Sequence, residues 1–208
     1  MPIQNLDDTA KQILSAATKR FLHYGYGKTT MSEIAGDCNM STGNVYRYFP
    51  SKLDLAETFV RVLREEQMDK LRAVARSGAS PQERLRALLK LKFKLSYERY
   101  HNRPKAQEMA LAILKERPQF AVDWEDAENE IIAEVLTAGA EAGVFEHRDQ
   151  LRLARIIQDV IYRFTSPDVI LEGEYEMLAS ELDEVIDLVM DAFSCRNARH
   201  GDDHTTAL

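Results

Sequence analysis

The amino-acid sequence predicts an all-α fold of about nine helices. Apolar residues recur at spacings of three and four along most of the 208-residue chain, capping residues and Gly or Pro stop signals separate the periodic segments, and no strand-like alternation occurs. With 45% hydrophobic and 29% charged residues, the chain can bury one large core or two modest ones. We predict an N-terminal domain over residues 1–50, a larger helical domain over 51–195 and a flexible tail over 196–208.

The first predicted helix covers residues 9–24 and ends at Gly25. Residues 1–6 precede the periodic pattern and are expected to be frayed. The apolar residues of the helix share one face, which we expect to pack on the two short helices that follow: Ile13, Leu14, Ala17, Phe21 and Tyr24.

Two short helices follow back to back in the N-terminal domain. Thr30 and Glu33 have capping-box spacing and open the first of them. Asn39 suits a left-handed turn, and Ser41 is an N-cap for the second helix, which Pro50 stops. This pattern indicates a helix-turn-helix unit. Because a unit this short buries little, its physical use is to present the exposed face of the second helix to a groove of DNA.

The side chains expected on that face are short polar, aromatic and basic groups, which suit phosphates and base edges. Lys28 and the helix caps can add contacts to the DNA backbone. The predicted DNA-binding residues are Lys28, Thr30, Ser41, Thr42, Gly43, Asn44, Tyr46, Arg47, Tyr48 and Lys52.

The same segment resembles the DNA-binding segment of the tetracycline-repressor (TetR) family. The family pattern runs Thr, hydrophobic, two variable residues, Ile-Ala, then Ser-x-Gly-x-hydrophobic-Tyr-x-aromatic-Phe, then Lys and Leu. The sequence departs from it at Cys38, Asn39 and Met40, where many members have Ala-Gly-Val, and at Tyr48, where many have His. These exchanges preserve the fold and bear on fine sequence preference. The matching residues are Thr30, Met31, Ile34, Ala35, Ser41, Gly43, Val45, Tyr46, Tyr48, Phe49, Lys52 and Leu55.

The net charge of -7 is unevenly distributed along the chain. Residues 1–60 carry six basic and six acidic groups, whereas residues 41–53 hold the basic residues Arg47 and Lys52 and no acidic one. The predicted DNA-facing surface is therefore locally positive, and the acidic remainder discourages promiscuous DNA binding. We expect affinity to come from specific groove contacts and from dimerisation, and to fall steeply as the salt concentration rises.

Beyond the helix-turn-helix unit, the chain continues as a series of helices. A long helix is predicted over residues 52–76, with Ser51 as its cap. Ser80 begins a second capping box and opens a helix over residues 81–100. The remaining signals are Pro104 and Pro118, which punctuate two more helices, and periodic segments over residues 124–142, 149–164 and 175–193.

The last two predicted helices are amphipathic, and the outer side of the final one is rich in Glu and Asp. They can pack as a pair and meet a symmetry mate as a four-helix bundle, which is the dimerisation role that the family resemblance implies. Such a dimer places its DNA-binding units roughly 34–36 Å apart and reads a near-palindromic operator. The alternative is that both stripes are internal core. The predicted interface residues are Ile157, Val160, Ile161, Phe164, Leu178, Leu182, Ile186, Val189 and Phe193.

By the same resemblance, the helices over residues 81–142 enclose a pocket for a small effector that changes the spacing of the two DNA-binding units. The expected ligand is an amphipathic small molecule that lowers DNA affinity. Aromatic and methionine side chains at helical spacing are more often core than pocket, so that alternative stays open. The candidate lining residues are Met68, Phe93, Tyr97, Tyr100, His101, Met109, Ile113, Phe120 and Trp124.

The sequence shows no sign of catalysis, since it lacks a phosphate-binding glycine loop, a Gly-x-Ser-x-Gly elbow and a His-Glu-x-x-His helix. His200 and His204 lie four residues apart in the polar tail, where a flexible tail is a simpler interpretation than a metal site. Cys38 and Cys195 are too few for a disulfide framework and are expected to be reduced thiols. We expect no enzyme activity, no cofactor and no bound metal.

These observations predict a cytoplasmic, dimeric, ligand-responsive transcriptional regulator, and a repressor in particular because binding in the resembled family usually occludes a promoter. No apolar run approaches the roughly 20 residues that span a bilayer, and the N-terminus lacks a signal core. The expected partners are double-stranded operator DNA, a second copy of the chain and an unidentified small-molecule effector. The alternative is a helical dimeric adaptor that binds only protein, which leaves the pattern from Ser41 to Lys52 unexplained.

Overall fold

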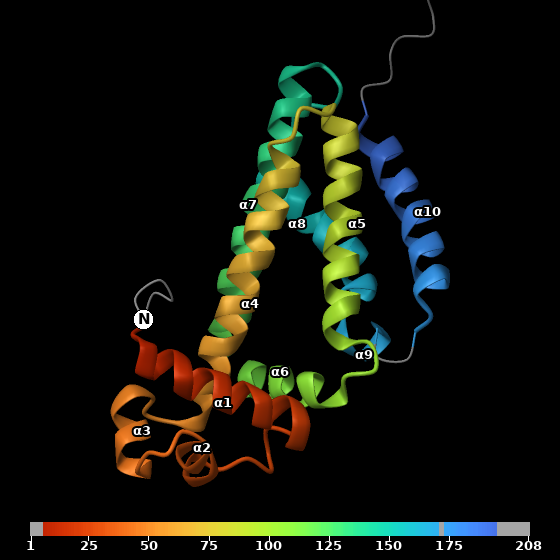
Figure 1. The fold of residues 1–208 in the computed structure, drawn as a ribbon. Helices are drawn as coiled ribbons and strands as arrows, with labels where there is room; N and C mark the ends of the chain where they lie inside the picture. Colours follow the sequence, from red (N-terminus) through yellow and green to blue (C-terminus); the bar gives the residue numbers. More distant parts are fainter. Residues whose placement is uncertain (1–5, 171–172, 195–208) are drawn as a thin grey trace, which may run out of the picture.

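The computed structural model describes residues 6–170 and 173–194, and it confirms the predicted all-α fold (Figure 1). Within these ranges nine helices have seven residues or more, and the only strand-like pairing is an isolated bridge between Phe145 and Ser194. The helices are α1 (Asp8–Tyr24), α2 (Met31–Asp37), α3 (Thr42–Tyr48), α4 (Lys52–Ala75), α5 (Pro81–Tyr100), α6 (Pro104–Glu116), α7 (Gln119–Glu141), α8 (Gln150–Ile161), the 3₁₀ turn η2 (Tyr162–Phe164), α9 (Pro167–Ile170) and α10 (Tyr175–Phe193).

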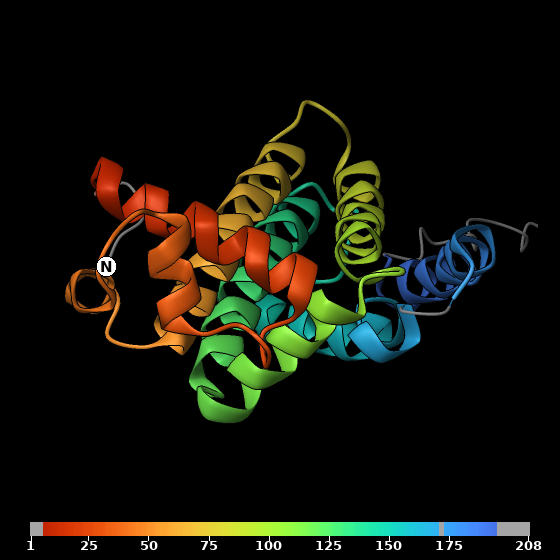
Figure 2. The same ribbon diagram turned by 60° about the horizontal axis from the view of Figure 1, so that its bottom comes forward.

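The helices form two groups, which we call the head and the body. The head consists of α1, α2 and α3 and lies at one end of the molecule, as Figure 1 and Figure 2 show from two directions. The body consists of α4 to α10, in which α5 contacts α4, α7 and α10. Helix α6 runs beside α1, and it therefore connects the two groups.

The core of the head extends into the body. Phe21, Ile34 and Val45 are fully buried at its centre, one from each helix of the head. The first turns of α4 and α7 and one face of α6 add apolar side chains to the same cluster, so the head packs as one unit with these parts of the body. The added residues are Leu55, Ala56, Met109, Ile113 and Phe120.

The predicted signals of the helix-turn-helix unit are confirmed in detail. The backbone N–H of Glu33 donates to Thr30 Oγ1 (3.3 Å), and the N–H of Thr30 donates to Glu33 Oε2 (2.8 Å), which completes the capping box. Asn39 has the left-handed backbone expected of the turn, with φ of 54°. Ser41 Oγ accepts from the N–H of Asn44 (3.2 Å) and starts α3.

Two helix boundaries differ from the prediction. Helix α7 begins at Gln119, five residues earlier than expected, because Pro118 has helical backbone angles (φ -59°, ψ -31°) and leads directly into the first turn. The segment predicted as one helix to Phe164 ends its α-helical part at Ile161 and tightens into η2. The four-residue α9 was not predicted, since it is too short to show a period.

Replacing Gly139 with alanine is expected to lower the free energy of unfolding by about 2 kcal/mol, equivalent to a fall in Tm of roughly 4–8 °C. A Cβ at this position lies 2.1 Å from the ring of Phe145, which is fully buried and packs edge-on against Phe193. The overlap forces one of the two elements to shift. Calorimetric unfolding of the parent and G139A measures the difference.

Gly36 provides a matched control for this substitution. It is exposed on α2, and a Cβ there meets no atom of the described residues within 4 Å. Because alanine forms helices better than glycine by roughly 0.8–1 kcal/mol, G36A should leave Tm unchanged or raise it. An equal loss of stability in both variants contradicts the role assigned to Phe145.

Candidate DNA interface and internal cavity

A bidentate ion pair orients α1 on the helix-turn-helix unit. Arg20 on α1 donates from Nε and Nη2 to the carboxylate of Asp37 at 2.5 and 2.8 Å, and it lies 3.3 Å from Glu33. The hydrogen bonds to Arg20 lower the pKa of Asp37, so the carboxylate stays charged at neutral pH. Two contacts between Gln12 and Cys38 join the same helices beside this pair. The position of α3 is thus set by α1 through α2.

Helix α3 is anchored by one apolar side and exposes the other. Val45 is buried in the core of the head, and Tyr48 packs at its edge. Tyr46 is 48% exposed, and Arg47 is exposed beside it in the sequence. The residues predicted for this face are therefore all exposed or half-buried. Its exposed members are Ser41, Gly43, Tyr46 and Arg47, and its half-buried members are Thr42, Asn44 and Tyr48.

Three predicted DNA contacts lie outside α3 and its N-cap Ser41. Lys28 and Thr30 are exposed, and the hydroxyl of Thr30 is occupied by its capping box. The expectation for Lys52 is corrected by the structure. Its ammonium donates to the backbone carbonyls of Tyr26 (2.7 Å) and Thr29 (2.9 Å) and lies over the Tyr26 ring. Lys52 therefore holds the loop between α1 and α2, and burial lowers its pKa.

A cavity of about 460 Å³ lies within the body, between α4, α5, α6, α7 and α8. Four of the nine predicted lining residues are found in its wall: Tyr100, Ile113, Phe120 and Trp124. This volume is within the range of small-molecule sites, roughly 300–1,000 Å³.

The other five predicted lining residues are corrected by the structure. Met68 and Met109 are packed in the cores of the body and the head. Phe93, Tyr97 and His101 lie on another face of α5 and contact one another in sequence. There Phe93 stacks on Tyr175 of α10 at a centroid distance of 5.1 Å, and Tyr97 meets the same ring edge-on at 5.0 Å. Helix α5 has neighbours on both sides, and periodicity does not tell which apolar face meets a cavity.

The charged residues of the cavity wall were not among the residues predicted from the sequence. Lys92 is only 7% exposed, and its ammonium donates to Glu128 Oε2 (2.6 Å) and to the side-chain oxygen of Gln158. Arg64 lies 3.3 Å from the other oxygen of Glu128. Burial alone raises the pKa of Glu128, but Lys92 and Arg64 outweigh it and the pKa is lowered. One signal in the sequence could have indicated them. Lys92 lies four residues after Leu88, so it falls on the apolar stripe of its helix, where a charged side chain is unexpected.

Most of the predicted dimer residues belong to the core of the protomer, which corrects that expectation. The apolar residues that recur at helical spacing on α8 and α10 pack on α7 and α5. They therefore fill the core of the protomer itself. Val160 is 46% exposed and Val189 is half-buried, so these two remain accessible. The residues buried within the protomer are Ile157, Ile161, Phe164, Leu178, Leu182, Ile186 and Phe193.

A second apolar surface, which we call the outer face, lies on the same two helices. It consists of Ile156 and Val160 on α8 and Met177 and Leu188 on α10. Leu188 is 70% exposed, the largest fraction among the exposed large hydrophobic residues of the described chain. Exposed apolar side chains gathered on neighbouring helices are typical of association surfaces.

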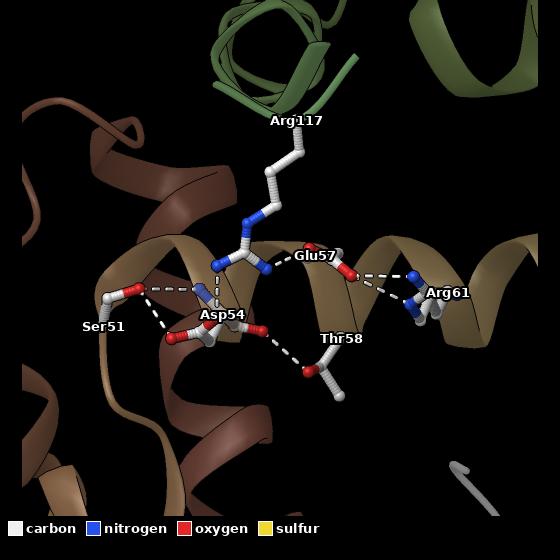
Figure 3. A network of polar contacts seen from close by, with 6 residues as sticks. All are labelled: Ser51, Asp54, Glu57, Thr58, Arg61 and Arg117. Atoms are coloured by element: carbon white, nitrogen blue, oxygen red, sulfur yellow. Dashed lines mark hydrogen bonds and ion pairs between the residues drawn. The ribbon is translucent and has the colours of Figure 1, made fainter. Parts of the chain in front are cut away.

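An ionic network joins the corner between α6 and α7 to the start of α4 (Figure 3). Arg117 donates to the carboxylates of Asp54 and Glu57, and Glu57 also accepts from Arg61 at 2.8 and 3.0 Å. Asp54 in turn accepts from the hydroxyl of Ser51, the N-cap of α4, at 2.7 Å. Burial alone raises the pKa of both carboxyls, but the hydrogen bonds from Arg117 outweigh it and lower the pKa of each.

The described residues contain no group of three His, Cys, Asp or Glu side chains that could hold a metal ion. Cys195, His200 and His204 lie outside these residues. Burial raises the pKa of the Cys38 thiol, which therefore stays protonated at neutral pH. None of the helices in the described part is long and apolar enough to cross a membrane.

Two protein-family models match the chain. The family described as "Bacterial regulatory proteins, tetR family" matches residues 13–58, and "Tetracyclin repressor-like, C-terminal domain" matches residues 81–186. The HTH-type transcriptional repressor KstR2 of Mycobacterium tuberculosis is 26% identical over 155 residues, which cover 74% of each protein. The HTH-type transcriptional regulator HbdR of an Aromatoleum species is 44% identical over 50 residues, 24% of this chain and 22% of that protein.

Solved structures have the same fold. A TetR-family regulator from Mesorhizobium loti superposes with a TM-score of 0.72 at 17% identity, over 89% of this chain and 96% of that chain. The regulator FadR of Bacillus subtilis, solved in complex with stearoyl-CoA, superposes with a TM-score of 0.62 at 20% identity, over 86% and 97%.

Proposed function

Because the chain belongs to the tetracycline-repressor family of DNA-binding transcriptional regulators, we propose that it represses transcription as a homodimer on a near-palindromic operator. A small molecule in the cavity of the body releases it from this operator. The observation that carries the proposal is the exposed face of α3, where Tyr46 and Arg47 lie on a surface without acidic side chains from residue 41 to residue 53.

The DNA contacts follow from the chemistry of this face. Arg47 is a bidentate donor suited to guanine in the major groove, and Asn44 suits adenine. Tyr46, Thr42 and Lys28 suit phosphate oxygens, which set the register of the protein on the duplex. Because the rest of the chain is acidic, these contacts carry the affinity and should weaken as salt rises.

The outer face of α8 and α10 supports the homodimer. Two copies can bury Ile156, Val160 and Leu188 against each other in a four-helix arrangement. The flanking charges on the two helices differ in sign, with Arg152 exposed on α8 and Glu184 on α10. A two-fold axis that brings α8 against α10 of the other copy pairs these charges.

The network around Arg117 supports a path from the cavity to the head. Ile113, Phe120 and Trp124 line the cavity from α6 and α7, on either side of Arg117. Arg117 binds the first turns of α4, which begins four residues after α3 ends. A ligand that displaces this corner therefore shifts α4 and the head together, which changes the spacing of the two recognition helices.

Two relatives are consistent with control by a small molecule. The FadR structure holds stearoyl-CoA, and a structure of KstR2 is described as a ketosteroid transcriptional regulator. FadR is thus a regulator of this fold with a bound organic molecule, and we extend control by a small molecule to this chain.

Selection of bound duplexes from a random DNA pool, followed by sequencing, tests the proposal. Recovery of a near-palindromic site is the expected result, since a symmetric dimer reads two equivalent half-sites. Enrichment without symmetry contradicts the dimer, and no enrichment contradicts sequence-specific DNA binding and favours the adaptor.

Replacing Arg117 with glutamine is expected to lower the free energy of unfolding by about 1 kcal/mol at pH 7, after allowance for solvent screening of a partly exposed side chain. The pKa values of Asp54 and Glu57 are lowered in the folded state, so the stabilisation is present above their unfolded pKa values, about 3.9 and 4.3, and is lost as pH falls through the folded values. Thermal unfolding from pH 7 to pH 3 should show the difference between parent and R117Q begin to shrink as the pH falls below about 4 and continue to shrink toward pH 3. R72Q, which breaks an exposed pair with Asp69, is the control and should have little effect at any pH.

A further inference from the structure

Three residues that line the cavity of the body each carry a buried side-chain nitrogen with no hydrogen-bond partner among the described residues. These are Nη2 of Arg99, Nε of Arg64 and Nε1 of Trp124. All three are N–H donors, and none of them can accept a hydrogen bond. Because unpaired buried donors cost free energy, three of them on residues that line one cavity favour an acceptor there.

The charges in the wall favour an anionic acceptor. Arg64, Lys92 and Arg99 are the buried or half-buried cations, and Glu128 is the only buried acid among the lining residues of the described chain. Lys92 and one nitrogen of Arg64 already neutralise Glu128. Arg99 has no carboxylate partner within salt-bridge distance among the described residues, and repulsion from Arg64 adds to the burial that lowers its pKa. An anion beside Arg99 relieves both effects.

The exposed part of the cavity wall is mainly negatively charged. Glu125, Asp126 and Asp159 are exposed lining residues, and Arg155 pairs with Asp126 there. These charges face water, where screening weakens them, and they do not alter the excess of donors inside. They do disfavour a ligand that carries several negative charges toward solvent.

Other buried residues of the cavity wall are apolar, and they indicate that the ligand also has an apolar part. Leu71, Leu95, Ile113 and Phe120 are buried side chains that line the cavity. A ligand that satisfies the three donors and also fills this space must combine a compact anion with an apolar body. A carboxylate fits, because its two oxygens accept several N–H groups at once and bind guanidinium well.

We propose that this cavity binds an organic monocarboxylate, whose oxygens accept from Arg99, Arg64 and Trp124 while its apolar body packs on Leu95 and Phe120. This proposal depends on the proposed function only for the effect that the ligand has on operator binding. Binding itself is a property of the cavity.

Trp124 is the only tryptophan of the chain and lines the cavity, so its fluorescence reports binding directly. The test titrates the full-length protein with octanoate, 1-octanol and octylamine, which share a chain length and differ in the charge of the head group. Saturable binding of octanoate at least tenfold tighter than that of 1-octanol, with no binding of octylamine, is expected. Equal affinity for octanoate and 1-octanol overturns the proposal, and this comparison needs no variant.

A variant then locates the carboxylate. R99M retains an apolar side chain of similar reach and should weaken octanoate at least tenfold while leaving 1-octanol unchanged. R155Q is the matched control, since Arg155 lines the exposed part of the same cavity and should change octanoate affinity less than twofold. Unchanged octanoate binding by folded R99M, judged by its melting temperature, also overturns the proposal.

Operator binding separates this inference from the proposed function. A parent protein that binds operator but no octanoate refutes the carboxylate site and leaves the regulator intact. A protein that binds octanoate through Arg99 without any change in operator affinity supports the site and refutes release by this ligand.

Discussion

Replacing Arg47 with alanine is expected to weaken specific operator binding strongly at physiological salt. An arginine that reads a base contributes about 1–3 kcal/mol, and a symmetric dimer presents it twice, so the loss is roughly 30-fold to 10⁴-fold in affinity. Arg47 is exposed on α3 and forms no part of the buried core of the head. Fluorescence anisotropy of a labelled operator measures the loss, and the circular dichroism spectrum should be unchanged.

The matched control is Arg72, an exposed arginine on α4 that pairs only weakly with Asp69 at the surface. R72A should bind operator within about twofold of the parent, because a side chain remote from the DNA contributes little beyond long-range attraction. If R47A and R72A bind operator equally well, α3 is not the recognition helix, and the assignment of the DNA interface fails.

Replacing Leu188 with glutamate is expected to dissociate the dimer. Leu188 is the most exposed large hydrophobic side chain of the described chain, and its burial in an interface is worth roughly 1.5–3 kcal/mol for each copy. Glutamate at this position removes this burial free energy and adds the cost of desolvating a charge. The dissociation constant of the dimer should therefore rise at least about 100-fold. Sedimentation at micromolar concentration should report the 23.8 kDa monomer for L188E and twice this mass for the parent. Operator affinity should fall with it.

Leu111 on α6 serves as the control, since it is also an exposed leucine but lies away from the outer face. L111E should keep the dimer mass, because a charge on an exposed surface position costs little. A parent protein that sediments as a monomer, or an L188E variant that remains dimeric, excludes the outer face as the interface.

The candidate site divides into a part that local rules predict and a part that they do not. The exposed side of α3 was predicted because Val45 and Arg47 lie within one turn, and the period of one helix assigns them to opposite sides. The contacts of Lys52 with Tyr26 and Thr29 were not predicted, since they join residues more than twenty positions apart in the sequence. Arg64, Arg99 and Trp124 line one cavity from three different helices, and no pattern within one segment can indicate that they do.

The sequence by itself determined the all-α class, the order of the helices and the helix-turn-helix unit. These features depend on interactions within about four residues, such as the capping boxes at Thr30 and Ser80 and the left-handed turn at Asn39. The tertiary structure decided which apolar stripe of each helix faces the core, so Leu182 is buried and Leu188 exposed on the same helix. It also decided that Lys92 and Arg99 lie in a cavity. The physical reason is that periodicity orients a helix about its own axis, whereas burial depends on which neighbours pack against each side.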